Sequence, residues 1–228
     1  DTSAHEGSFD SPVTWRLELD GAAHLCPLIT GIAFRDVTNG PSPDWMARRL
    51  TAIGQRPISA LVDITNYVMF DLGRPLHAYD MDKIHGGELV VRQADGGEPF
   101  AALNEKTYEM EAGMITIGDA EGVDDLAGVM GGERTGVSDD TTGMFLEIAV
   151  FDPISVATTG RKLNLNSDAR YRFERGLDSE SPIWAAGHIA RMVTDICGGT
   201  ASVPVTMGLG VDWKRSIFLA ADKVESLS

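Results

Sequence analysis

The sequence has few cysteines and no long hydrophobic run. Only two of the 228 residues are cysteine, Cys26 and Cys197, and both lie in apolar contexts without the spacing of metal ligands. We therefore expect buried free thiols in a reducing compartment, with no disulfide and no metal site. No apolar stretch approaches the length of a membrane span and the start does not resemble a signal peptide, so we expect a cytoplasmic protein without a membrane partner.

Cations are scarce as well. Lys and Arg together number 19 against 34 Asp and Glu, which gives a formal net charge of −15. Such a field repels a polyanion, because affinity for nucleic acid rests largely on cations that neutralise phosphates. Nucleic acid is therefore either not a ligand, or it presents only its tip while another surface holds the phosphates. The first residue is Asp rather than Met, which favours a piece excised from a longer chain.

Common catalytic motifs are also missing. The sequence contains no phosphate loop of the G-x-x-x-x-G-K type, no G-x-G-x-x-G after a strand, no H-E-x-x-H and no G-x-S-x-G. These absences exclude the usual sequence signatures of nucleotide binding, zinc proteolysis and serine activation. Any chemistry must come from a less familiar arrangement of polar residues.

The order of the remaining patterns indicates one α+β domain. Residues 1–12 are polar and aperiodic, so we expect a disordered lead-in. We predict strands at 15–19 and 28–34, and a helix at 41–54 with Ser42 as its N-cap and Pro43 at its first position. Short strands follow between 88 and 152, and helices return at 153–162, 169–175 and 182–197, the last with Ser181 as its N-cap and Ile183 facing inward. We expect one compact domain at 13–205, with a sheet-rich, sandwich-like middle flanked by helices, and the truncated start of a further strand-and-helix module at 206–228.

One stretch, residues 58–80, carries most of the local information. Its apolar residues recur at the spacing of one buried helical face, at Ile58, Leu61, Val62, Val68, Met69 and Leu72. Thr65 and Asn66 lie on or beside that face. Gly73 is suited to end the helix, and Pro75 then forces an extended step that delivers His77 close to the helix end. Hydroxyl, amide and imidazole could form a small polar pocket, or they could be ordinary caps and satisfied core groups.

Three further places could carry chemistry. Gly131, in the run Gly131-Gly-Glu-Arg-Thr-Gly136, is either part of a tight turn or a point where backbone approaches a ligand. Glu147 stands among apolar residues and either faces solvent or is buried and needs a hydrogen-bond donor. Ser167 and Ala169 are both small, so they would leave space for a ligand beside them. We expect a structural role in salt bridges for the charged residues that follow, Arg170, Arg172, Glu174 and Arg175.

Taken together, these motifs carry a resemblance. They are Asp63-Ile-Thr-Asn-Tyr, Gly73-Arg-Pro-Leu-His-Ala-Tyr-Asp, Met130-Gly-Gly-Glu, Leu146-Glu, Ser167-Asp-Ala-Arg-Tyr-Arg-Phe-Glu-Arg-Gly and Asp195-Ile-Cys-Gly-Gly. In this order, over roughly residues 41–201, the chain closely resembles the editing domain of the β subunit of bacterial phenylalanyl-tRNA synthetases, counted as the third and fourth modules of that subunit. Each motif is weak alone, but the set is highly specific.

The resemblance implies hydrolysis of tRNA(Phe) mischarged with tyrosine. Phenylalanine and tyrosine differ by one hydroxyl, which an apolar synthetic pocket rejects only modestly. By analogy with the family, Glu147 would accept a hydrogen bond from the tyrosine hydroxyl, and phenylalanine would leave Glu147 unpaired. His77 would help to position the terminal adenosine, the ester or the attacking water. Thr65 and Asn66 would contribute hydrogen bonds around the aminoacyl group, Gly131 would offer backbone, and Ser167 and Ala169 would form a small-residue wall.

The resemblance also implies partners. These are the 3′ end of tRNA(Phe) carrying tyrosine and a synthetase α subunit in an α2β2 heterotetramer. No cofactor is expected in this segment, whereas the full synthetase would use ATP and Mg²⁺ in the α subunit. The alternative is a non-catalytic module that braces the synthetase or binds RNA. The joint presence of His77, Glu147 and the Ser167/Ala169 wall favours editing, because bracing would not need them.

Overall fold

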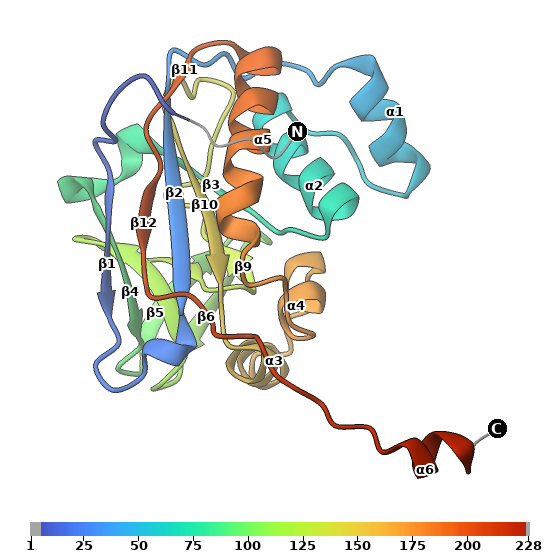
Figure 1. Cartoon of the computed structure of the whole chain (residues 1–228). Helices are drawn as coiled ribbons and strands as arrows, with labels where there is room; N and C mark the ends of the chain where they lie inside the picture. The colour runs from blue at the N-terminus through green and yellow to red at the C-terminus, as the bar shows by residue number, and fades with distance from the viewer. Residues whose placement is uncertain (1–5, 227–228) are drawn as a thin grey trace.

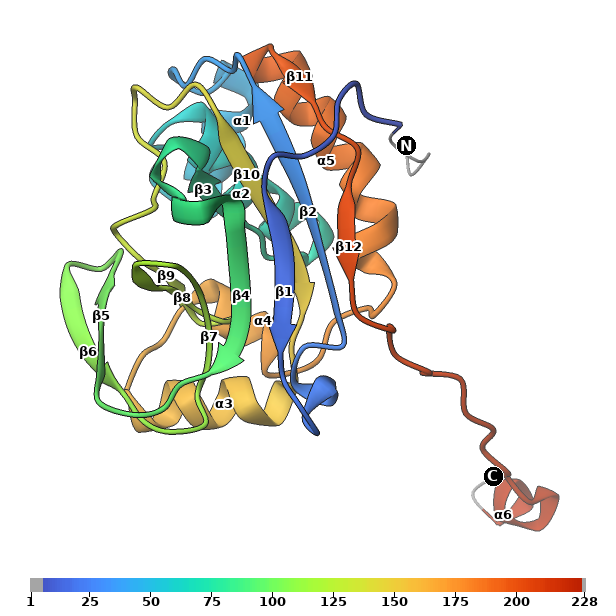
Figure 2. The same ribbon diagram turned by 90° about the vertical axis from the view of Figure 1, so that its left-hand side faces the viewer.

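Two β-sheets lie face to face, and helices cover the outer face of the second sheet (Figures 1 and 2). The computed structural model describes residues 6–226. One apolar core fills the space between the sheets, and another lies between the second sheet and the helices. The α+β class predicted from the sequence is confirmed, and its sandwich consists of these two sheets.

The first sheet has the order β1-β4-β7-β8-β9, with β1 parallel to β4 and every other pair antiparallel. Its strands are β1 (Thr14–Glu18), β4 (Glu88–Gln93), β7 (Ile115–Asp119), β8 (Gly122–Leu126) and β9 (Met130–Gly131). The second sheet is antiparallel, with the order β11-β2-β10-β3 and with β12 also pairing with β2. Its strands are β2 (Leu28–Arg35), β3 (His77–Asp80), β10 (Met144–Val150), β11 (Thr200–Ala201) and β12 (Val205–Met207). A separate hairpin consists of β5 (Glu98–Ala102) and β6 (Lys106–Met110).

The helices lie largely where the sequence predicts them. They are α1 (Asp44–Ala52), α2 (Ala60–Leu72), α3 (Pro153–Lys162), α4 (Asp168–Phe173), α5 (Ser181–Cys197) and α6 (Ala221–Glu225), with short 3-10 turns η1 (Ala23–Leu25), η2 (Met81–Lys83) and η3 (His85–Gly87). Figure 1 shows α5 running along the second sheet, with α2 beside it. Gly73 ends α2 in the left-handed conformation at φ 66°, as predicted, because a residue without a Cβ adopts it at little cost.

The central strand β10 is buried on both faces. Met144, Leu146 and Ile148 pack toward the helices, whereas Phe145 and Ala149 face the first sheet. Side chains alternate along a strand, so Glu147 lies on the face between the sheets. A solvent-facing Glu147, one of the two alternatives in the sequence, is therefore wrong: this strand has no solvent face.

Several local expectations need correction. Helix α1 begins at Asp44 with Pro43 as its N-cap residue, and the Ser42 hydroxyl instead donates to Asp63 Oδ2 at 2.5 Å. Ser181 is the first residue of α5 rather than its cap. Ile58 and Ile183 are 70% and 63% exposed instead of buried, because Ile58 precedes α2 and Ile183 lies on the outer face of α5.

The two ends of the chain also differ from expectation. Residues 1–5 of the predicted lead-in lie outside the described residues, and residues 6–12 are attached rather than frayed: Ser8 N donates to Ala201 O, and Arg35 stacks on the Phe9 ring. Residues 208–220 form no strand, although the start of a strand-and-helix module was predicted at 206–228, and α6 follows them. Cys26 and Cys197 are buried and unbridged. Among residues 6–226, no helix is both long and apolar enough to cross a bilayer.

Close contact between the sheets requires glycine at position 31. A Cβ at Gly31 would lie 2.1 Å from Phe145 Cζ and 2.7 Å from Trp15 Nε1, and the two rings are themselves packed at 5.2 Å between centroids. We predict that Gly31→Ala lowers the free energy of unfolding by about 1–3 kcal/mol, the usual cost of overpacking a core. Urea denaturation measures this. Gly40→Ala is the matched control, since a Cβ there meets nothing within 4 Å, and an equal loss in both variants would contradict the explanation.

Candidate functional site

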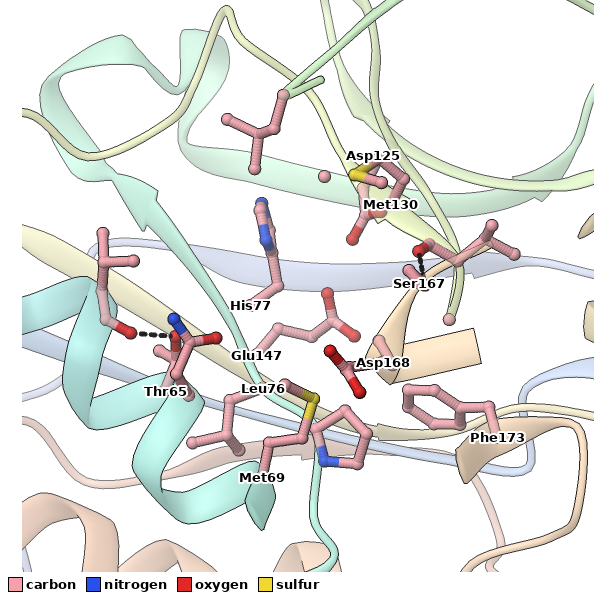
Figure 3. Close-up of a pocket in the computed structure, with 18 of the residues that line it drawn as sticks. Thr65, Met69, Leu76, His77, Asp125, Met130, Glu147, Ser167, Asp168 and Phe173 are labelled. Atoms are coloured by element: carbon pink, nitrogen blue, oxygen red, sulfur yellow. Dashed lines mark hydrogen bonds between the residues drawn. The ribbon is translucent and has the colours of Figure 1, made fainter. Parts of the chain in front are cut away.

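A cavity of about 400 Å³ lies where the edges of the two sheets meet. Its wall combines the edge strands β3 and β9 with the middle of β10, one face of α2 and the start of α4 (Figure 3). The lining is mostly apolar, with Met69, Leu76, Met130 and Phe173 on the walls. The exposed residues Leu103, Asn166 and Asp168 also line it.

All seven site residues predicted from the sequence line this cavity. They are Thr65, Asn66, His77, Gly131, Glu147, Ser167 and Ala169. They come from α2, β3, β9, β10 and the N-terminal end of α4, so the fold gathers residues that lie up to about a hundred positions apart in the chain. Their individual roles stay predictions.

Glu147 is the most constrained of these residues. It is only 4% exposed, it pairs with His77 and Gly31 in the strand register, and its Oε2 accepts from the Tyr79 hydroxyl at 3.2 Å. Burial disfavours the charged form and raises the pKa of Glu147 to about 7, although hydrogen bonds from Asp125 and Tyr79 and the charge of Arg74 oppose that shift. Glu147 therefore has partners before any ligand arrives.

Asp125 is a cavity residue that sequence reasoning missed. It lies on β8 in the first sheet, is 4% exposed and also accepts from the Tyr79 hydroxyl, at 3.3 Å. Burial, followed by the neighbouring charge of Glu147, raises the pKa of Asp125 well above its usual range. The available signal was a pair of aspartates, Asp124 and Asp125, inside a predicted strand. Asp124 faces away and forms an ion pair with Arg134 at 2.6 Å.

Arg74 was also missed. It is 1% exposed and lies just after α2, where it donates to Ser181 Oγ at 2.8 Å and to the Ala149 carbonyl. Burial lowers its pKa to about 10, while the charges of Glu147 and Asp178 oppose the shift, so Arg74 remains charged at neutral pH. Its positive charge lowers the pKa of Glu147, and its hydrogen bonds connect β10 to the start of α5.

His77 projects from β3 on the same face as Glu147. Its ring meets the Tyr79 ring edge-on at 4.4 Å between centroids. The residue as a whole is half-buried, but Nε2 is enclosed and has no hydrogen-bond partner among the described residues. Burial lowers the pKa of His77 to about 4, so the imidazole is neutral at neutral pH. A neutral ring can accept one hydrogen bond and donate another.

Gly131 is required by the His77 ring. It belongs to the short strand β9, not to a turn, and its φ is not positive. A Cβ at this position would lie 2.1 Å from His77 Cε1. The tight-turn alternative is therefore wrong for Gly131, and the glycine serves close approach between its own backbone and the imidazole.

The remaining predicted residues differ in how free their polar groups are. Thr65 Oγ1 donates to Val62 O at 2.7 Å, within its own helix. Ser167 caps α4 by accepting from Arg170 N at 3.0 Å and also donates to Val129 O at 2.6 Å, so it joins α4 to the segment before β9. The Asn66 amide makes no hydrogen bond within residues 6–226, which leaves it available to a ligand.

The charged residues of α4 brace the site. Arg170 is 9% exposed, donates to Leu165 O at 2.8 Å and pairs with Glu174 at 3.1 Å. Arg172 pairs with Asp168 at 3.4 Å, and Arg175 with Glu174 at 2.8 Å. The predicted salt bridges are thus present. Within the described part of the chain, no group of three or more His, Cys, Asp or Glu side chains could hold a metal ion.

Comparison with known proteins places the chain in a family. The model of the B3/4 domain matches residues 25–198, and the chain belongs to this family. Curated relatives include the phenylalanine–tRNA ligase β subunits of Ruegeria pomeroyi and Paramagnetospirillum magneticum. Each is 49% identical over 97% of this chain, which covers 27% and 28% of those relatives. The chain therefore spans about a quarter of their length. An N-terminal fragment of the phenylalanyl-tRNA synthetase β subunit from Pyrococcus horikoshii is 15% identical, with a TM-score of 0.44 over 70% of this chain and 51% of that chain.

The contact between Gly131 and His77 can be tested by a double-mutant cycle. We predict that Gly131→Ala destabilises the fold by about 1–3 kcal/mol, because the new methyl group overlaps the imidazole. In a His77→Ala background the same change should cost far less, since the ring is gone. Urea denaturation of the four proteins measures the coupling. Additive effects would show that Gly131 is needed for some other reason.

The enclosed position of His77 predicts its titration. Its pKa of about 4 lies below the ordinary 6.5, so the ring should remain neutral from pH 8 down to about pH 5. The unfolded chain binds the proton at higher pH, so the stability contributed by neutral His77 is lost as pH falls from about 6.5 toward 4. Nitrogen-15 NMR of the imidazole ring measures this, with His77→Gln identifying the signal. A midpoint near 6.5 would contradict the burial argument.

Proposed function

We propose that this chain is the editing domain of a phenylalanine–tRNA ligase β subunit and that its cavity hydrolyses Tyr-tRNA(Phe). The observation that carries the proposal is the buried Glu147 carboxyl in the wall of a mostly apolar cavity. Membership of the B3/4 domain family and the similarity to ligase β subunits support it. The volume suits an aromatic side chain, since ligand cavities begin at about 300 Å³.

Recognition would depend on one hydroxyl group. The apolar walls accept the ring of either amino acid, and only tyrosine can donate a hydrogen bond to the Glu147 carboxyl. One expectation from the sequence changes here: phenylalanine would not leave Glu147 without a partner, because Tyr79 and Asp125 already contact it. The discrimination therefore comes from an added hydrogen bond to a charged acceptor, which contributes about 1.5–3 kcal/mol.

Hydrolysis itself requires water at the ester carbonyl. The water adds its oxygen to the carbonyl carbon, the bond to the terminal ribose oxygen breaks, and tyrosine and tRNA with a free ribose hydroxyl are released. His77 is neutral and lines the cavity, so its imidazole is suited to hold that water or the ribose by a hydrogen bond. The free Asn66 amide and the neighbouring Thr65 would orient the aminoacyl group. Ser167 and Ala169 would form the opposite wall and leave space for the substrate.

The acidic surface limits how the substrate is presented. With a net charge of −15, the chain is suited to receive a single-stranded 3′ end rather than the body of a tRNA. Other modules of the ligase and its α subunit would hold the rest. ATP and Mg²⁺ would act at the aminoacylation site elsewhere in the full enzyme, and the cavity needs neither for hydrolysis of an ester.

The proposal is tested by comparing the deacylation of Tyr-tRNA(Phe) and Phe-tRNA(Phe) by this chain. We expect faster loss of the tyrosyl ester, with kcat/KM for that ester reduced about tenfold to a hundredfold by Glu147→Gln and the phenylalanyl ester little changed. Glu109→Gln, on the exposed side of β6, is the matched control and should behave like the unmodified chain.

A lack of activity in the isolated chain is followed up with the intact enzyme. If the chain alone is inactive, the same pair of substrates is given to a full ligase that contains it. Failure of that enzyme to clear Tyr-tRNA(Phe) faster than Phe-tRNA(Phe) would overturn the proposal and leave the cavity with a bracing or RNA-contacting role.

A further inference from the structure

Two buried carboxyl groups meet in the cavity wall, one from each sheet. Asp125 projects from β8 and Glu147 from β10, each is 4% exposed, and both line the same cavity. The Tyr79 hydroxyl contacts both, at 3.3 Å to Asp125 Oδ2 and 3.2 Å to Glu147 Oε2. One hydroxyl hydrogen cannot pair with two buried carboxylates at once, so a proton on one of the two carboxyls is favoured. Figure 3 shows both side chains pointing into the same part of the cavity.

The charges around the pair indicate how many protons it holds. Arg74 is the buried cation whose charge acts on Glu147, and its guanidinium is itself enclosed. Two ionised carboxylates beside one cation would leave a net buried negative charge, which the interior disfavours strongly. One proton on the pair balances the single charge of Arg74.

We infer that Asp125 is a specificity-determining residue of the proposed esterase: as a neutral carboxylic acid it donates its proton to Glu147 and keeps Glu147 as the charged acceptor for a phenolic hydroxyl. The substrate part of this inference rests on the proposed function. The shared proton does not, because it is a property of the folded chain. The Tyr79 hydroxyl is a phenolic group of the chain itself that already contacts both carboxyls, as the hydroxyl of a tyrosyl ligand would.

The location of the proton follows from the surroundings of the two groups. Burial and the neighbouring Glu147 and Asp124 raise the pKa of Asp125, and only the hydrogen bond from Tyr79 opposes them. Glu147 has Asp125, Tyr79 and Arg74 near it, and all three lower its pKa against the effect of burial, leaving it at about 7. Asp125 therefore keeps the proton, and Glu147 becomes the anion as pH rises through about 7.

Other titratable groups lie around the pair, and they set the pH range of the test. They are Tyr79 and His77 on β3, Arg74 after α2, Asp124 on β8, Asp168 on α4 and Cys26 after η1. Burial raises the pKa of Tyr79 and of Cys26, so both stay neutral at pH 8. Arg74 stays charged with a pKa of about 10, and His77 stays neutral with a pKa of about 4. Burial raises the pKa of Asp124 to about 6, so it is ionised at pH 8.

The first arm of the test detects the proton without any substrate. Infrared spectroscopy at pH 8 should show the C=O stretch of a protonated carboxylic acid, and Asp125→Asn should remove it. Glu147→Gln should weaken it as well, because Asp125 then becomes the carboxylate that balances Arg74. Asp124→Asn, on the same strand but paired with Arg134, is the matched control and should leave the band in place. Absence of the band in the unmodified chain, or its persistence in Asp125→Asn, would overturn the inference.

The second arm measures specificity as the ratio of kcat/KM for the tyrosyl and phenylalanyl esters between pH 6.5 and 8.5. We expect this ratio to rise through about pH 7 in the unmodified chain as Glu147 ionises. Asp125→Asn should keep the ratio within about threefold, because an amide N–H still donates to Glu147. Asp125→Ala should lower the ratio at pH 8 roughly tenfold and move its midpoint to higher pH, because the anion loses a donor.

The outcomes separate this inference from the proposed function. Circular dichroism and thermal unfolding establish that each variant is folded, and Asp125→Asn serves if Asp125→Ala is not. A folded Asp125→Ala chain with an unchanged ratio and midpoint, or an Asp125→Asn chain as poor as Asp125→Ala, would overturn the specificity role. If neither ester is hydrolysed by the unmodified chain or by a full ligase, the proposed function fails and the specificity role with it, while the infrared band still decides the shared proton.

Discussion

The structure depends on one constraint: a strand that is buried on both faces carries a carboxyl group. Around Glu147, β10 contributes only apolar side chains to the two cores. An isolated carboxylate in that setting would be strongly disfavoured, so the surrounding elements supply a donor, a second carboxyl and a cation. Tyr79, Asp125 and Arg74 come from β3, β8 and the turn after α2, and each is itself buried. These four residues thus connect elements of the fold that are far apart in the sequence.

The same constraint explains why the cavity lies at the sheet edges. Near the middle of the sandwich, Phe145 and Trp15 fill the space over Gly31. Two residues further along β10 the row consists of Gly31, Glu147 and His77, in that order across the second sheet. β3 and β9 are edge strands, so no further strand continues either sheet there, and α2 and α4 close the space instead. A large apolar residue at position 147 would extend the core through the cavity.

The sequence predicted correctly those features that depend only on neighbouring residues. The bounds of α3, the left-handed end of α2 at Gly73 and the two buried thiols follow from residue spacing and chain propensity. The residue patterns singled out all seven cavity residues but left open whether they meet, and only the resemblance placed them in one site. Asp125 and Arg74 were missed because their burial depends on how the two sheets pack, which no stretch of sequence contains. Ser42 was misassigned for a related reason: the buried Asp63 carboxylate, a distant partner, competes for its hydroxyl.

The chemistry of the polar centre sets a limit on selectivity. Tyr79 already offers a phenol to both carboxyl groups, so the free cavity contains the same kind of contact that a tyrosyl ligand would make. The ionised carboxylate of the pair has more acceptor sites than one hydroxyl can use, since it presents about four lone-pair positions. A second phenol can therefore be added without displacing the first. The benzyl group of phenylalanine forms no hydrogen bond there, but the carboxyl groups still have the Tyr79 hydroxyl as a partner. Such a site therefore favours tyrosine by adding a hydrogen bond and does not exclude phenylalanine.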